Sequence, residues 1–193
     1  ISGDPEYGIP VLDPWYIRNV SASEFGLTVK TINMTISGSS KGHLESFKTD
    51  FEEKSVTLDY RIPRLRFKGH YTIQGRLVAI PIYGEGPFEA NMTNVVLRYR
   101  TKFQTAVKED GKEYAIPEKY QMEFLPEFLE FVLENIFGRN KQINDAVNKF
   151  FNENWKIVMK EAGKPVTNTL GHVFHDIIKD LGEKIPLSEV FSK

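Results

Sequence analysis

The feature that most constrains the fold is a long amphipathic segment near the end of the chain, at residues 141–184. Its apolar residues recur at intervals of three and four, which is the period of one face of an α-helix. The face comprises Ile143, Val147, Phe150, Phe151, Asn154, Val158, Ala162, Val166, Leu170, Val173, Phe174, Ile177 and Leu181.

The length of this helix limits the shape of the domain. A helix of about 40 residues is roughly 60 Å long, whereas a compact chain of 193 residues is only about 40 Å across. The helix therefore either breaks or belongs to an elongated domain. We expect it to be the longest element, to begin at a cap at Asn140 or Asn144, and to kink near Gly163 to Pro165. No heptad pattern is sustained, so its apolar face needs a sheet as partner.

Residues 15–124 have the pattern of β-strands. Apolar residues alternate with polar ones, for example over residues 56–62 and 71–77, as in strands with one buried face. Asp110-Gly111 is typical of a hairpin turn, because glycine accepts the positive φ that a tight turn needs. A strongly curved antiparallel sheet wrapped around the long helix accounts for both the strand pattern and the helical segment. The sequence therefore predicts an α+β fold that encloses an apolar space.

The segment at residues 124–137 fits two structures. Phe128, Leu129, Val132 and Leu133 belong to one face of a helix, whereas Leu129, Phe131 and Leu133 lie on one face of a strand. The pattern alone favours the helix.

Composition and motifs exclude several function classes. The chain has 25 Lys+Arg and 26 Asp+Glu, so no basic excess attracts nucleic acid. Gly84-Glu85-Gly86 lacks the third glycine of a dinucleotide fingerprint and precedes a strand pattern rather than a helix. A lipid-ester hydrolase needs an accessible nucleophile beside a base, and no such arrangement is legible. We therefore expect no enzyme.

Two histidines have a spacing that metal sites use. His172 and His175 are three residues apart, so one helix face presents both. The chain has no cysteine and no apparent third ligand. We expect neither a metal nor a cofactor, and solvated histidines on the helix are the alternative to a metal site.

Three Asn-x-Ser/Thr triplets bear on compartment. Asn19, Asn33 and Asn91 are predicted N-glycosylation sites, which points to secretion. Ordinary surface asparagines are the alternative interpretation.

Several motifs, in this order along nearly the whole chain, resemble the takeout and juvenile-hormone-binding protein family of insects. This family is part of the tubular lipid-binding superfamily. The resemblance is carried by GIPVLDPW at residues 8–15, TINMTISGSSK at 31–41, YRIPRLRFKGHYTIQGRLVAIPIYGEGPFEANMTNV at 60–95, LENIFGRNKQINDAVNKFFNENWK at 133–156 and KIPLSEVF at 184–191.

The resemblance implies one takeout-like lipid-binding domain over residues 1–193. It implies a secreted, extracellular carrier whose tunnel takes a hydrophobic molecule such as a terpenoid hormone or a fatty acid, without stable membrane insertion. It also implies that Gly84 to Gly86 is a bend in the sheet and that the segment after Phe128 begins as a strand. Family members carry a disulfide in a segment before the Gly-Ile-Pro motif, and we expect that this segment has been lost or trimmed. The alternative function is a secreted signalling or structural protein with a filled core.

Alternation in the strands and the helical face together predict the ligand-binding wall. Residues of the same parity share a face of a strand, so the sheet residues of the wall belong together. Tyr71 is our first candidate to orient a polar end of the ligand. We expect a monomer whose wall is formed by Leu65, Phe67, Tyr71, Ile73, Leu77, Phe128, Val132, Phe150, Phe151, Trp155, Val158 and Phe174.

Overall fold

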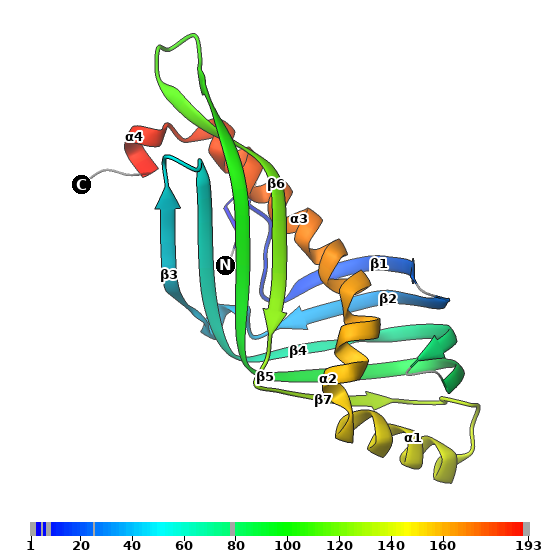
Figure 1. The fold of residues 1–193 in the computed structure, drawn as a ribbon. Helices are drawn as coiled ribbons and strands as arrows, with labels where there is room; N and C mark the ends of the chain where they lie inside the picture. Colours follow the sequence, from blue (N-terminus) through cyan, green and yellow to red (C-terminus); the bar gives the residue numbers. More distant parts are fainter. Residues whose placement is uncertain (1–2, 5, 7–8, 25, 78–79, 191–193) are drawn as a thin grey trace.

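The computed structural model describes residues 3–4, 6, 9–24, 26–77 and 80–190. Gly8, Val78, Ala79 and Phe191, which belong to the motifs that carry the resemblance, lie outside the described residues. The fold is α+β, as the sequence predicts: one long antiparallel sheet is followed by C-terminal helices (Figure 1).

The seven strands of the sheet have the order β1-β2-β4-β5-β6, with β3 paired to β4 and β7 paired to β5. β4 pairs with β5 along its whole length, from Ser55 opposite Lys102 to Leu77 opposite Ile80. The strands are β1 (Trp15–Glu24), β2 (Leu27–Ser37), β3 (His43–Asp50), β4 (Ser55–Leu77), β5 (Ile80–Val107), β6 (Glu113–Leu125) and β7 (Phe128–Leu133).

The sheet has two arms because β4 and β5 change partners halfway along. The first half of β4 pairs with β3 and the second with β2, whereas the first half of β5 pairs with β7 and the second with β6. The strands turn between the arms (Figure 1). Pro63, which has no backbone N–H, lies there between Ile62 and Arg64, and Asn94 on β5 has a φ of 52°. These two residues interrupt the regular ladder where the sheet bends.

The helical region is not the single long helix that we expected. It consists of α1 (Lys141–Glu153), α2 (Trp155–Val158), a π-helical turn η2 (Met159–Gly163) and α3 (Lys164–Lys184), followed by α4 (Leu187–Val190). Asn140 caps α1, and its side chain accepts a hydrogen bond from the N–H of Ile143 at 3.2 Å. The break comes at Asn154, whose φ and ψ are not helical and whose side chain donates to the carbonyl of Phe150 at 2.8 Å.

The positions of the break and the irregular turn correct the expected kink. The path changes direction between α1 and α2, well before Gly163 to Pro165, where the chain instead leaves the π-helical turn and enters α3 (Figure 1). Proline at the start of α3 is tolerated because the first turn of a helix has no partner for that N–H. The longest element is β5, with 28 residues against 21 in α3.

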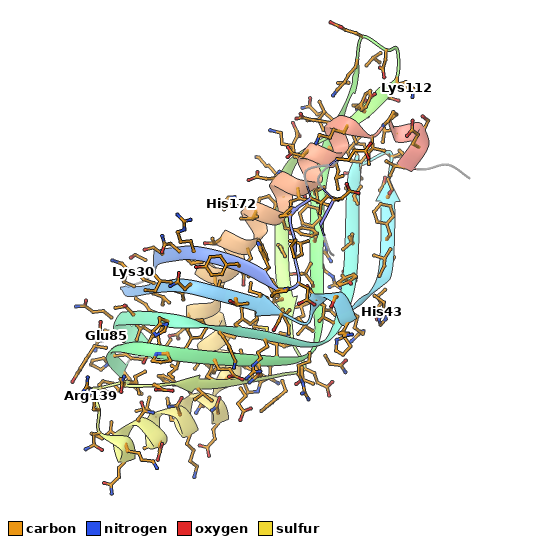
Figure 2. The ribbon with its side chains drawn as sticks, turned by 180° about the vertical axis from the view of Figure 1, so that it is seen from behind. Lys30, His43, Glu85, Lys112, Arg139 and His172 are labelled. Carbon is orange, nitrogen blue, oxygen red and sulfur yellow. The ribbon has the colours of Figure 1, made fainter. Side chains whose placement is uncertain are left out.

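The helices cover the concave face of the sheet. α3 packs on β6 and β1, and α1 and α2 pack on β7, so the helical region links the edges of a sheet that is not closed on itself. The domain is elongated, with Lys112 and Arg139 at opposite ends (Figure 2). Within the described ranges, no helix has the length and apolar character to cross a bilayer.

The segment after Phe128 is strand β7, as the resemblance implies, and the helix that the pattern favours is wrong. One edge of β7 pairs with β5. Asparagines of α1 bond to the other edge: Asn148 accepts from the N–H of Leu133 and donates to its carbonyl, both at 2.8 Å. Asn152 does the same for Phe131, at 2.6 and 2.8 Å. The asparagine amides thus take the place of a neighbouring strand, which local periodicity cannot reveal.

Both glycine motifs have clear places in the fold. Asp110-Gly111 forms the hairpin between β5 and β6, and the φ of Gly111 is 75°, which confirms the predicted turn. Gly84 and Gly86 lie within β5, under the chain that leaves β7. A Cβ on Gly84 would lie 2.9 Å from the Cα of Ile136, so glycine is required there for close approach of two backbones.

Candidate functional site

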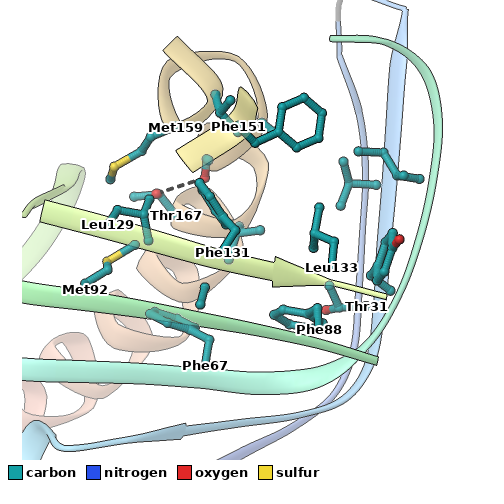
Figure 3. A pocket seen from close by; sticks show the side chains of 18 of the residues that line it. Thr31, Phe67, Phe88, Met92, Leu129, Phe131, Leu133, Phe151, Met159 and Thr167 are labelled. Atoms are coloured by element: carbon teal, nitrogen blue, oxygen red, sulfur yellow. Dashed lines mark hydrogen bonds between the residues drawn. The ribbon is translucent and has the colours of Figure 1, made fainter. Parts of the chain in front are cut away.

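A central cavity of about 150 Å³ lies between the concave face of the sheet and the helices (Figure 3). Its wall combines side chains from the five strands β2, β4, β5, β6 and β7 with side chains from the helical region. The lining residues are Val29, Thr31, Met34, Phe67, Tyr71, Ile73, Leu77, Phe88, Ala90, Met92, Phe124, Leu129, Phe131, Leu133, Phe151, Val158, Met159, Ala162, Gly163, Val166, Thr167 and Leu170.

The sheet side of this wall follows the alternation of β4. Phe67, Tyr71, Ile73 and Leu77 line the central cavity, and each is at most 6% exposed. Leu65 has the same parity and lines a neighbouring cavity. The five residues therefore lie on one buried face, as their spacing predicts. Their contact with a ligand stays a prediction.

Strand β7 presents the opposite set of residues from the one we expected. Leu129, Phe131 and Leu133 line the cavity (Figure 3), whereas Phe128 and Val132 are 47% and 48% exposed on the outer face. Their assignment to the wall followed a helical face, and a strand turns alternate residues outward instead.

The predicted helical residues are distributed over several spaces. Phe151 and Val158 line the central cavity, Phe150 lines a neighbouring cavity beside α1, and Phe174 lines a cavity at the other end. Trp155 lies in a surface groove between β6 and the helices, where its ring and that of Phe128 form a T-shaped pair with centroids 6.2 Å apart.

The apolar interior continues beyond the central cavity at both ends. A cavity of about 260 Å³ shares Phe124 and Leu170 with it, and we call this the N-terminal cavity because Leu12 and Trp15 line it. A cavity of about 180 Å³, the α1 cavity, shares Leu77 and Phe151. Single side chains therefore separate adjoining apolar spaces along the domain.

Several residues of the site were missed from the sequence. Phe88, Ala90 and Met92 line the cavity from β5. They alternate with polar residues in the sequence, so a parity argument applied to β5 would have found them. Leu170 lies on the predicted helical face and Phe124 in the strand pattern, but neither pattern shows that the two residues meet, because that depends on how α3 crosses β6.

Among the residues that the structure describes, no charged side chain lines the central cavity, and the hydroxyl groups of the cavity already have partners. The hydroxyl of Tyr71 donates to the carbonyl of Glu134 at 2.8 Å, and burial raises the pKa of Tyr71 to about 12. Thr167 donates to the carbonyl of Gly163 at 3.0 Å, and Thr31 donates weakly to the sulfur of Met34 at 4.0 Å. The wall thus offers a ligand lone pairs but no hydroxyl hydrogen.

The two helix histidines have different surroundings. Nδ1 of His175 lies 2.6 Å from the hydroxyl of Tyr99, and the His175 ring stacks on Tyr120 with centroids 4.4 Å apart. Burial lowers the pKa of His175 below its ordinary value and raises that of Tyr99 to about 12. His172 is exposed. In the described part of the chain, no three His, Cys, Asp or Glu side chains are grouped as a metal site requires.

A surface groove opens beside the central cavity, between β6 and the helical region. Met159, Gly163 and Thr167 of the helices and Phe124 of β6 line both the groove and the cavity, so we call it the mouth groove. Its remaining lining residues are Tyr120, Gln121, Met122, Glu123, Leu125, Pro126, Trp155, Lys156, Lys160, Lys164, Asn168 and His172.

The three predicted glycosylation sites lie on the strands. Asn19 and Asn33 are exposed, on β1 and β2. Asn91 is half-buried on β5, and its amide donates to Glu89 at 2.9 Å. Modification of all three stays a prediction.

Comparison with known proteins gives matches over nearly the whole chain. Residues 1–192 match the profile of the family described as Haemolymph juvenile hormone binding protein (JHBP). The Circadian clock-controlled protein daywake of Drosophila melanogaster is 25% identical, over 100% of this chain and 78% of its own length. Daywake of Drosophila yakuba is 24% identical, over 77% of this chain and 57% of its own length.

A solved structure has the same fold. The crystal structure of Takeout 1 from Epiphyas postvittana superposes with a TM-score of 0.88 at 27% sequence identity, covering 98% of this chain and 88% of the other. The sheet, its two arms and the helical region are therefore arranged as in a takeout protein.

Proposed function

The chain belongs to the haemolymph juvenile hormone binding protein family, and from that premise we propose that it carries one hydrophobic small molecule in its interior. The observation that carries the proposal is the row of adjoining apolar cavities between sheet and helices. A protein that served only as a structural or signalling scaffold would gain stability from filling this space, because empty volume removes packing contacts.

The cavity volumes indicate how a ligand would lie. Pockets for small molecules usually measure about 300–1,000 Å³. The central cavity, at about 150 Å³, is smaller than this range, and so is each neighbour. A terpenoid or fatty acyl chain would therefore extend from the central cavity into a neighbouring one. Phe124 and Leu170, or Leu77 and Phe151, would move aside to join the spaces.

We place the protein in the extracellular fluid. The family name refers to haemolymph, and the exposed Asn19 and Asn33 are accessible to the glycosylation machinery. Affinity would come mainly from burial of the ligand's apolar surface, at about 25 cal/mol per Å² before the cost of ordering. Binding should show a negative heat-capacity change.

The proposal is tested by filling the cavity from the sheet side. Ala90 lies on β5 between Phe67 and Phe131, is 7% exposed and lines the central cavity. Ala90→Phe places a ring in the space that the ligand would occupy. We expect the affinity for the neutral dye Nile red, measured by fluorescence titration, to fall by about tenfold or more.

Ala106→Phe is the matched control, because Ala106 lies on the same strand but outside the central, N-terminal and α1 cavities. It should bind the dye as the wild type does, and thermal unfolding would show whether both variants are folded. Equal affinity of the two folded variants, or a wild-type protein that binds no apolar compound and co-purifies with none in native mass spectrometry, would contradict a carrier function.

A further inference from the structure

The mouth groove has an uneven distribution of charge. Lys156, Lys160 and Lys164 lie along its helical side at intervals of four residues, and all three are exposed. The acidic residue among the lining side chains is Glu123, which pairs across the β5–β6 ladder with Arg98. Within the described ranges, none of the three lysines forms an ion pair. The groove is therefore a positively charged surface.

The row of lysines runs beside the opening into the central cavity. Met159 and Gly163, which line both spaces, lie between the lysines in the sequence. The lysine side chains are long, and Nζ of Lys156 lies 5.6 Å from the centre of the Trp155 ring, at the surface of the groove. An apolar chain that enters at Met159 thus leaves its outer end within reach of several ammonium groups.

The interior cannot hold a negative charge. An ionised carboxylate only accepts hydrogen bonds, and the hydroxyls of Thr31, Tyr71 and Thr167 already donate their hydrogens to other groups. Burying a charge without donors is strongly unfavourable. An anionic head would therefore remain in the mouth groove, where the lysines supply donors and the opposite charge.

From this complementarity, and on the basis of the proposed carrier function, we propose that the mouth groove binds the anionic head of a single-chain amphiphile whose apolar tail fills the central cavity. The head is a carboxylate or a group of similar charge, and the lysine row is its binding site. The site gives the carrier a preference for an acid over the corresponding neutral ester.

The experiment compares lauric acid with methyl laurate, which share a tail and differ in charge. Displacement of Nile red at neutral pH and low salt would give both affinities. Exposed ion pairs each contribute little, so we expect the wild type to prefer the acid by about five- to tenfold. In the variant K156Q/K160Q/K164Q the ratio of the two affinities should fall to about one. High salt should reduce the preference of the wild type in the same way.

The control variant K41Q/K48Q/K54Q removes the same charge from exposed lysines outside the mouth groove and the central cavity, and it should keep the wild-type ratio. Equal affinities for acid and ester in the wild type would overturn the proposal. So would a preserved ratio in the mouth variant combined with lost binding to phosphatidylserine vesicles, because the lysines would then be a membrane contact. Failure of both compounds to bind would overturn the carrier function with it.

Discussion

The two walls of the central cavity are built from similar apolar side chains but are held in different ways. The sheet wall belongs to a ladder in which β4 pairs with β5 over the whole length of β4, and β2 and β7 extend the ladder on either side. Phe67, Tyr71 and Ile73 of β4 therefore lie between paired strands on both sides. Large rearrangements of this wall would break many hydrogen bonds at once.

The helical wall has no comparable frame. It is interrupted at Asn154 and again by the π-helical turn at Met159–Gly163, and it contacts the sheet through side chains. π-helical turns inside helices often accompany functional sites. Here the turn lies beside both the cavity and the mouth groove. From this comparison we expect the sheet to be the fixed side of the cavity and the helices to be the side that would adapt to a ligand.

The sharpest way to break this comparison is to remove the same side chain from each wall. Leu129 on β7 and Leu170 on α3 both line the cavity, and each is 1% exposed. A Leu→Ala change in a core costs about 2–5 kcal/mol, and less where the surroundings collapse into the gap. We expect Leu129→Ala to lower the free energy of unfolding by about 4 kcal/mol and Leu170→Ala by about 2 kcal/mol, measured by urea denaturation.

The order of the two values decides the question. If Leu170→Ala costs as much as Leu129→Ala or more, α3 is held as firmly as β7 and the helices are not the adaptable side. The slope of each denaturation curve serves as the control, because an unchanged slope shows that the variant still unfolds from the same compact state.

A second prediction concerns the place where the helices are fixed to the sheet. Asn148 bonds to both the N–H and the carbonyl of Leu133. Asn148→Ala leaves these groups without their partner at the edge of β7, and an unsatisfied backbone group costs about 1–3 kcal/mol when solvent does not replace the bond. We expect a loss of about 2 kcal/mol, together with faster hydrogen exchange of the Leu133 amide.

Gln142→Ala is the control for this substitution, because Gln142 is exposed on the same helix. It should change stability by less than about 0.5 kcal/mol. Protection of the Leu133 amide that is equal in the two variants would show that β7 does not depend on α1 for its outer edge.

The sheet wall, held by a backbone ladder, is easier to predict from the sequence than the helical wall, held by side-chain contacts. The inward residues of β4, such as Phe67 and Ile73, are predictable because period two survives any tertiary arrangement of a strand. Strand β7 was not predictable from its own pattern, because Phe128 to Leu133 fits both the helical and the strand period. The outer edge of β7 is completed by Asn148 and Asn152, which come later in the chain. Such long-range hydrogen bonds leave no local pattern.

The helical wall shows the same limit. Its apolar face is visible at the expected period, yet the break at Asn154 is not, because asparagine occurs both within helices and at their ends. The cavities themselves depend on how far α3 lies from β6, and that distance is set by packing. Of the site, the sequence therefore identifies inward-facing residues better than the space between them.

The smallest predicted effect concerns His175, which fixes α3 to β5. Tyr99, with its pKa raised to about 12, stays protonated, and its hydroxyl lies 2.6 Å from Nδ1 of His175, which accepts its hydrogen when the neutral ring carries its own proton on Nε2; a backbone hydrogen bond to Glu118 also acts on the ring. Asp176, Lys179 and His172 also act on this ring, and burial holds the pKa of His175 below 6.5. Protonation of Nδ1 removes the acceptor that Tyr99 needs.

The sign of the pH dependence follows from that lowered pKa. At pH values between the pKa of His175 in the folded protein and 6.5, the unfolded chain binds more protons than the folded protein does. Stability is therefore lost as pH falls from neutral through this range. His175 is partly exposed, so we expect a loss below about 1 kcal/mol. In His175→Gln the fall in the urea midpoint between neutral pH and about pH 5 should be smaller than in the wild type. In His172→Gln the midpoint should fall as much as in the wild type. If the midpoint of His175→Gln also falls as much as that of the wild type, the contact between Tyr99 and His175 does not make the helical wall sensitive to acid. The two walls would then differ in how they are held but not in their response to pH.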